Sequence, residues 1–214
     1  MPIGLTPLQK HGRLAELAQT SRYFTKSNSV RIQKIREKLN GAGVEVEEPI
    51  QNLGNGRALF SKNGFSFDSP PGIRQFVVNT REVVDKICKT VAKMNFAGIT
   101  HNHLHIGNIG ITKGGKIIIL ELNLAKFRPP ATNFVGNDWA ELSTSLSRLY
   151  ARCIRKFQNR TASRAELAGF REHIYAKLFF YTFEYAGEMK ADWVKFEKAF
   201  SKHFPQYKKQ FKLP

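Results

Sequence analysis

The stretch GITHNHLHIGNIGITKGGKIIILELNLAK, residues 98–126, decides the fold of this chain. It follows a long helical pattern and contains two isoleucine-rich runs on either side of a Lys-Gly-Gly-Lys turn. We predict strands at 109–112 and 117–120 that pair as a β-hairpin. One polar loop precedes the first strand of the hairpin, and a second polar loop follows its second strand.

These two loops carry the side chains that could bind a metal ion or take part in catalysis. The first loop contains His101, His103, His105 and Asn108, and the second begins at Glu121. An amide oxygen and a carboxylate placed in this way can converge on one hard cation, and Mg²⁺ prefers a few protein oxygens together with phosphates and water. A different interpretation is also open, because three alternating imidazoles on one strand face could bind Zn²⁺ as in a metal-dependent hydrolase.

The chain before this stretch mixes strands with one helix, and the chain after it is helical. Capping boxes at 138–141 and 163–166 predict two helix starts. The order therefore predicts an α+β fold in two lobes, with a β-rich lobe at 1–68 and a helical lobe containing one hairpin at 69–214. The expected helices are 29–40, 77–94, two that begin at 138 and 163, and 190–203; the expected strands are 44–46 and 57–60, and 68–72 is a hinge or loop. Residues 1–26 fit either two short strands, at 14–18 and 22–26, or a helix at 8–19.

The loop-hairpin-loop segment resembles the catalytic and magnesium loops of the protein-kinase-like superfamily. It is similar to the RIO-type kinases, the small kinase that accompanies the KEOPS complex, and the aminoglycoside phosphotransferases, whose loop reads H-G-D-L-H-x-x-N before a hairpin and I-D-F-G. His101 matches the loop histidine, Asn108 the metal-binding asparagine, and Glu121 the aspartate of Asp-Phe-Gly. The resemblance implies a protein-kinase-like fold that binds ATP with Mg²⁺.

Two departures from the family pattern bear on activity. His103 stands where the family has its catalytic aspartate, which orients or deprotonates the acceptor hydroxyl. A neutral imidazole can accept a proton but supplies no negative charge. Glu121 keeps a carboxylate but adds one methylene. The resemblance therefore implies a pseudokinase, or an ATP-dependent phosphotransferase with altered chemistry in which His103 and His101 are the catalytic-loop residues.

The resemblance extends in weaker form to about residues 10–75. It implies that Lys26 holds the nucleotide phosphates with Glu37 as its ion-pair partner, and that Ser61 and Asn63 border the adenine. Asp138 takes the position of the aspartate that braces the catalytic loop. The span between Lys126 and Asp138 is too short for an activation loop.

The net charge of the chain indicates which kinds of partner it could bind. The 214 residues carry 34 Lys and Arg against 17 Asp and Glu, a formal net charge of +17. Such a positive field attracts phosphates, whether on a nucleotide, a nucleic acid or a membrane surface. An acidic protein or a nucleic acid is therefore a possible partner, and the chain could be a basic scaffold module instead of an enzyme. Lysines interleaved with aromatics at 190–214 fit single-stranded nucleic acid, or a helix packed on the core.

The two cysteines, Cys88 and Cys153, lie in apolar helical patterns and form no metal knuckle or disulfide framework. They indicate a reducing, cytoplasmic setting. No secretory signal is visible at the N-terminus, although export by a dedicated machine needs none. No apolar run approaches the roughly 18 residues that span a bilayer, which predicts no transmembrane segment.

Overall fold

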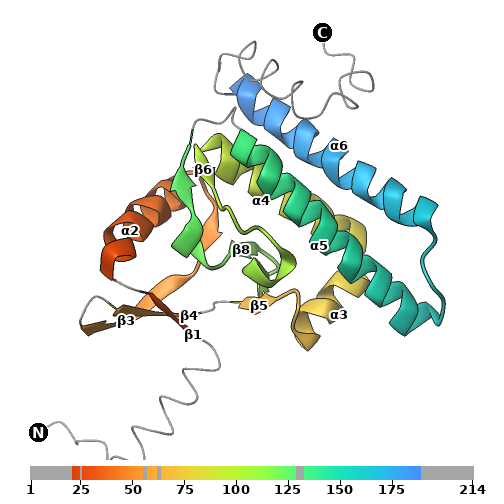
Figure 1. The fold of residues 1–214 in the computed structure, drawn as a ribbon, viewed down its shortest axis with the longest axis horizontal. Coiled ribbons are helices and arrows are strands. Elements are labelled where there is room, and N and C mark those ends of the chain that lie inside the picture. The colour runs from red at the N-terminus through yellow and green to blue at the C-terminus, as the bar shows by residue number, and fades with distance from the viewer. Residues whose placement is uncertain (1–20, 25, 55–56, 62–63, 129–132, 189–214) are drawn as a thin grey trace, which may run out of the picture.

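The computed structural model of the chain describes residues 21–24, 26–54, 57–61, 64–128 and 133–188. Within these residues the chain is α+β, with a β-rich part and a helical part that contains one β-hairpin, as predicted. In Figure 1 the strands β1, β3 and β4 lie at the lower left with α2 above them, and α4, α5 and α6 lie at the upper right. In chain order the elements are β1 (Ser21–Phe24), α2 (Lys26–Gly41), β2 (Glu45–Val46), β3 (Glu48–Gly54), β4 (Arg57–Ser61), β5 (Gly64–Ser66), α3 (Pro70–Val78), α4 (Thr80–Phe96), β6 (Ile99–Thr100), η1 (Ile106–Asn108), β7 (Ile109–Thr112), β8 (Ile117–Ile119), η2 (Leu122–Leu124), β9 (Lys126–Phe127), α5 (Asn133–Gln158) and α6 (Arg164–Glu188).

The β-rich part consists of an antiparallel sheet in the order β1-β4-β3 and the helix α2. Ile32, Ile35 and Leu39 are buried on α2 at three- and four-residue spacing, which is the pattern of a helix that packs one face on a core. Burial of each such side chain contributes about 1.5–3 kcal/mol. The amphipathic helix predicted at 29–40 is therefore confirmed, although it begins at Lys26.

The predicted hairpin forms the centre of a second sheet, in the order β2-β8-β7-β5. Its turn is closed by the Thr112 amide, which donates to the Lys116 carbonyl at 2.8 Å, and Gly115 takes a positive φ of 77° that suits glycine. Every isoleucine of the hairpin is buried, so side chains on both faces of the sheet contact other elements. The sheet joins the two parts of the molecule, because β2 pairs with β8 and β5 pairs with β7.

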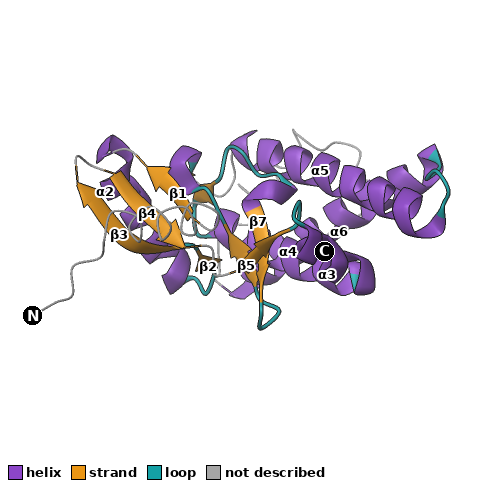
Figure 2. Ribbon diagram, turned by 90° about the horizontal axis from the view of Figure 1, so that it is seen from below, coloured by secondary structure: helices purple, strands orange, loops and turns teal. Residues whose placement is uncertain are grey.

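The helical part is built around α4, whose apolar face is buried over most of its length. Helices α4 and α6 pack against each other, as do α5 and α6. Tyr181 and Lys177 of α6 both bind Asp85 of α4, so a polar contact also links the two helices. In Figure 2 the sheet of β1, β4 and β3 lies at one end of the molecule, and α5 extends toward the other end.

Three sequence-based expectations about element ends are wrong. Residues 68–72 are not a hinge, because the Ser69 side chain caps α3 by accepting from the Gly72 amide. The helix expected at 77–94 is divided into α3 and α4 at Asn79, whose backbone is not helical. The helix expected to begin at Asp138 begins at Asn133, so Asp138 does not cap it.

Other expectations are confirmed or fall outside the described residues. The capping box at the start of α6 is present, since Ser163 and Glu166 exchange hydrogen bonds of 2.8 and 3.1 Å. Both cysteines are free and buried. No described helix combines the length and the apolar content that membrane crossing requires. The elements expected at 8–19 and 190–203 lie outside the residues that the structure describes.

Candidate functional site

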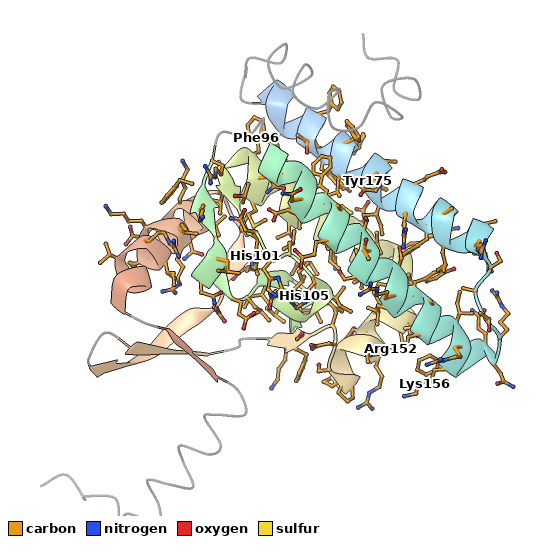
Figure 3. The ribbon with its side chains drawn as sticks, viewed as in Figure 1. Phe96, His101, His105, Arg152, Lys156 and Tyr175 are labelled. Carbon is orange, nitrogen blue, oxygen red and sulfur yellow. The ribbon has the colours of Figure 1, made fainter. Side chains whose placement is uncertain are left out.

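The two polar loops meet beside the sheet. We call residues 101–108 the histidine loop; it leads through η1 into β7, and the segment that begins at Glu121 leaves β8 at the same end of the hairpin. The Leu120 amide donates to the Asn108 carbonyl at 2.9 Å, which holds the two loops together. Figure 3 shows His101 and His105 in the middle of the molecule, between the strands and α5. The backbones of Asn108 and Glu121 therefore lie near each other at one end of the hairpin.

His101 is a buried, neutral structural group. Its Nε2 donates to the Leu120 carbonyl at 2.7 Å, and its Nδ1 is buried without a hydrogen-bond partner among the described residues. Because a proton on Nδ1 would have no acceptor, burial lowers the pKa of His101 to about 4. His101 therefore connects the histidine loop to the end of β8 and does not face the open part of the loop.

Asp138 holds the start of the histidine loop from inside α5. Its carboxylate accepts the backbone amides of His101 and Asn102, both at 2.8 Å, and the side-chain amide of Asn95 at 3.2 Å. Burial raises the pKa of Asp138 to about 6, while these three donors act in the opposite direction. The bracing contact expected for Asp138 is confirmed, even though the residue is not a helix cap.

His103 is the exposed histidine of the loop, and it contacts a carboxylate and a second imidazole. Its Nδ1 lies 3.1 Å from Oε1 of Glu141 on α5, and its Nε2 lies 3.2 Å from Nε2 of His105. The Gly107 amide donates to Nδ1 of His105 at 3.0 Å, so a neutral His105 carries its proton on Nε2. In that tautomer His105 donates to His103, and His103 donates from Nδ1 to Glu141. The amide nitrogen of Asn108, a donor, lies 3.3 Å from the same Nε2 of His105 and suits the other tautomer.

Asn108 and Glu121, the two predicted metal ligands, are held by the loops around them. Asn108 is buried, and its amide nitrogen donates to the His103 carbonyl at 2.9 Å. The Glu121 amide donates to Oε1 of Glu47 at 2.9 Å, so a buried carboxylate from the β-rich part positions Glu121. The amide oxygen of Asn108 and the carboxylate of Glu121 are both hard donors that suit Mg²⁺.

Backbone strain occurs at the same two loops. Asn102 and Glu121 have positive φ values of 60° and 57°, in the left-handed region that non-glycine residues rarely adopt. Such conformations cost on the order of 1 kcal/mol each and persist where surrounding contacts hold them, often at functional sites. Here the Asp138 and Glu47 carboxylates hold them, since each accepts the backbone amide of a strained residue.

The residues expected to bind the nucleotide that the structure describes lie on two elements of the β-rich part, α2 and β4. Lys26 is the first residue of α2, not the end of a strand, and Glu37 lies on the same helix. Their separation of eleven residues along one helix corresponds to about 16 Å. Glu37 is exposed and accepts from Gln33 at 2.9 Å. Ser61 ends β4, and Asn63 lies outside the described residues.

The alternative site in which three histidines bind a metal is not formed. His101 is turned into the core, whereas His103 and His105 contact each other through their rings, whose centroids are 4.5 Å apart. Among the described residues, no group of three or more His, Cys, Asp or Glu side chains could hold a metal ion. A hydrolase that uses all three imidazoles as metal ligands is therefore not supported.

Two acidic residues of the site were missed in the sequence. Glu141 stood out only as the last residue of a capping box, and Glu47 only as one of several acids in a short run. Both lie far along the chain from the residues they contact, so no local pattern indicates them. The one available signal is that Glu141 lies three residues after Asp138, which places both on the side of α5 that meets the histidine loop.

A separate cavity of about 610 Å³ lies among α4, α5 and α6, and no predicted site residue lines it. Its wall combines apolar, polar and charged side chains of both signs, and it includes a stacked pair of rings, Tyr150 and Phe170, with centroids 4.3 Å apart. The lining residues are Thr80, Arg81, Val84, Tyr150, Glu166, Phe170 and His173.

Comparison with known proteins adds no relative. No model of a protein family matches the chain, and no curated protein matches it either.

Proposed function

We propose that this chain is a kinase-like nucleotide-binding protein in which Asn108 and Glu121 hold a Mg²⁺–nucleotide complex. One observation supports the proposal: the backbone hydrogen bond between Leu120 and Asn108 brings Asn108, which carries an amide oxygen, close to Glu121, which carries a carboxylate. Two oxygen ligands, completed by phosphates and water, suit Mg²⁺. The net charge of +17 further favours an anionic ligand.

The loop contacts favour binding over transfer. Phosphoryl transfer needs a group that orients or deprotonates the acceptor hydroxyl. His103 is the residue at that position, and Glu141 gives it the negative charge that an imidazole lacks. In the observed arrangement, however, Nε2 of His103 is engaged by His105, so His103 can accept a hydroxyl proton only after that contact opens. A pseudokinase is the first expectation, and an unorthodox ATP-dependent phosphotransferase is the second.

Calorimetric titration of the full chain with ATP and Mg²⁺ tests the binding step. We expect saturable binding that requires the metal, and an affinity at least about tenfold lower for Glu121→Gln, because even outer partners of a metal site contribute that much. The matched control is Glu82→Gln, which changes an exposed carboxylate on α4 that pairs with Lys86. The proposal fails if ATP with Mg²⁺ or Mn²⁺ gives neither heat nor a thermal shift.

Transfer is tested separately with labelled ATP. If the wild-type chain transfers the γ-phosphoryl group, His103→Ala and Glu141→Gln should both reduce the rate while nucleotide affinity stays unchanged. Transfer that survives His103→Ala undamaged would remove His103 from the mechanism.

A further inference from the structure

Helix α5 carries a row of cations that the nucleotide proposal does not use. From Leu142 to Ala165 the chain contains six Arg or Lys and no Asp or Glu. Four of these cations are exposed on α5 and form no ion pair with any described residue: Arg148, Arg152, Arg155 and Lys156. We call these four residues the α5 basic face.

The four cations share one side of the helix. At 3.6 residues per turn, positions 148, 152, 155 and 156 fall within an arc of about 100°, and they extend over about 12 Å of the helix axis. Leu142, Leu146 and Leu149 fall beyond the Lys156 edge of this arc, within a further 80° or so, and are buried. The positive charge is therefore concentrated in a short strip and is not spread around the helix. In Figure 3 Arg152 and Lys156 lie toward the far end of α5.

The same side of α5 leads back to the histidine loop. Glu141 and Ser145 precede Arg148 by seven and three residues, so they lie on the side of the helix that carries the basic face. Glu141 contacts His103, and the Ser145 hydroxyl accepts the Ile106 amide at 3.2 Å. A chain-like ligand that lies along the basic face would thus end at the exposed histidine of the loop.

We propose that the α5 basic face binds the phosphate backbone of a nucleic acid and leads it toward the histidine loop. A nucleic acid strand offers a phosphate charge every few ångströms, which a compact row of cations can neutralise. Three of the four cations are arginines, whose planar guanidinium pairs with phosphate through two hydrogen bonds. Phe157 adds an aromatic ring that is 52% exposed and has the Lys156 ammonium 5.6 Å from its centroid. Exposed rings beside cations can stack on unpaired bases.

Fluorescence anisotropy of the full chain with labelled 20-nucleotide single strands and duplexes tests this surface, without ATP. The test variant is Arg148→Gln/Arg152→Gln, and the matched control is Lys34→Gln/Lys113→Gln, which removes the same charge from exposed positions elsewhere. We expect at least about a tenfold loss of affinity for the test variant and little loss for the control. The slope of log affinity against log salt should fall by about 1.4 for single strands.

Several results would overturn the proposal. Equal losses for the two variants would mean that binding follows net charge alone. If poly-glutamate competes as effectively as a nucleic acid of equal charge, the partner is an acidic protein instead. If the labelled strands do not bind at 50 mM salt, neither a nucleic acid nor an acidic protein is the partner of this face. None of these results depends on ATP, so the failure of this proposal and that of the nucleotide proposal can be told apart.

Discussion

Asp138 shows how one buried carboxylate organises a loop that is distant in sequence. It accepts three N–H donors, two of them backbone amides of the histidine loop and the third the side-chain amide of Asn95. Asn95 is itself held by the Trp139 ring nitrogen at 3.0 Å. The loop conformation therefore depends on contacts between α4, α5 and the loop, and not on the local sequence of the loop.

We expect Asp138→Asn to lower the free energy of unfolding by about 2 kcal/mol, because an amide NH₂ would face a buried N–H and leave it unsatisfied. Urea denaturation measures this change. Asp68→Asn is the matched control: Asp68 is exposed and accepts from the Ser66 hydroxyl, and an asparagine oxygen can still do so. Equal effects of the two substitutions would contradict the bracing role.

His101 predicts a pH dependence of stability. Its pKa is about 4 in the folded chain and near 6.5 when unfolded, so between these values the unfolded state binds the extra proton. The contribution of His101 to the free energy of unfolding is fully present above pH 6.5. It decreases by on the order of 2–3 kcal/mol as the pH falls toward 4. Asp138 acts oppositely, because its raised pKa makes the folded state bind a proton between about pH 4 and pH 6.

The measurement compares wild type with His101→Gln, which keeps a side-chain donor for the Leu120 carbonyl but cannot ionise. The difference in unfolding free energy between the two proteins should narrow between pH 7 and pH 4.5, since only the wild type loses this contribution. A difference that stays constant over this range would show that His101 does not titrate in this way.

Local patterns predicted the elements better than their ends. The isoleucine-rich hairpin, the amphipathic face of α2 and the capping box of α6 were all visible in the sequence, because periodicity and capping act over a few residues. The break at Asn79 and the early start of α5 were not. These ends depend on where a neighbouring element stops packing, which no short pattern contains.

The end of α4 offers a test with two glycines. Gly98 has a φ of +77°, and a Cβ there would lie 2.9 Å from the Arg128 carbonyl oxygen, whereas Gly169 inside α6 has nothing within 4 Å. We expect Gly98→Ala to destabilise by about 2 kcal/mol through left-handed strain and this close approach. Gly169→Ala should stabilise by about 0.5–1 kcal/mol through helix propensity. Urea midpoints of both variants provide the comparison, and a neutral Gly98→Ala would contradict the strain argument.

At the scale of the whole molecule, charge is the dominant feature. A net charge of +17 on 214 residues produces repulsion that is strongest in the compact state. We expect the midpoint of thermal unfolding to rise between 20 and 300 mM NaCl, as salt screens this repulsion. Arg148→Gln/Arg152→Gln should show a smaller rise than wild type, because two of the repelling charges are gone. A midpoint that falls with salt would mean that attractive ion pairs dominate instead.

The sequence was sufficient for the α+β class, the hairpin and the positions of the two polar loops, because these follow from short-range periodicity and turn residues. It was not sufficient for the contacts that define the site. Asp138 meets His101 across a separation of 37 residues, and Glu47 meets Glu121 across 74. Glu141 contacts His103, and Lys26 and Glu37 lie eleven residues apart on one helix, only because helices α5 and α2 extend as they do. Such contacts depend on how distant segments pack, so they exist only once the chain has folded.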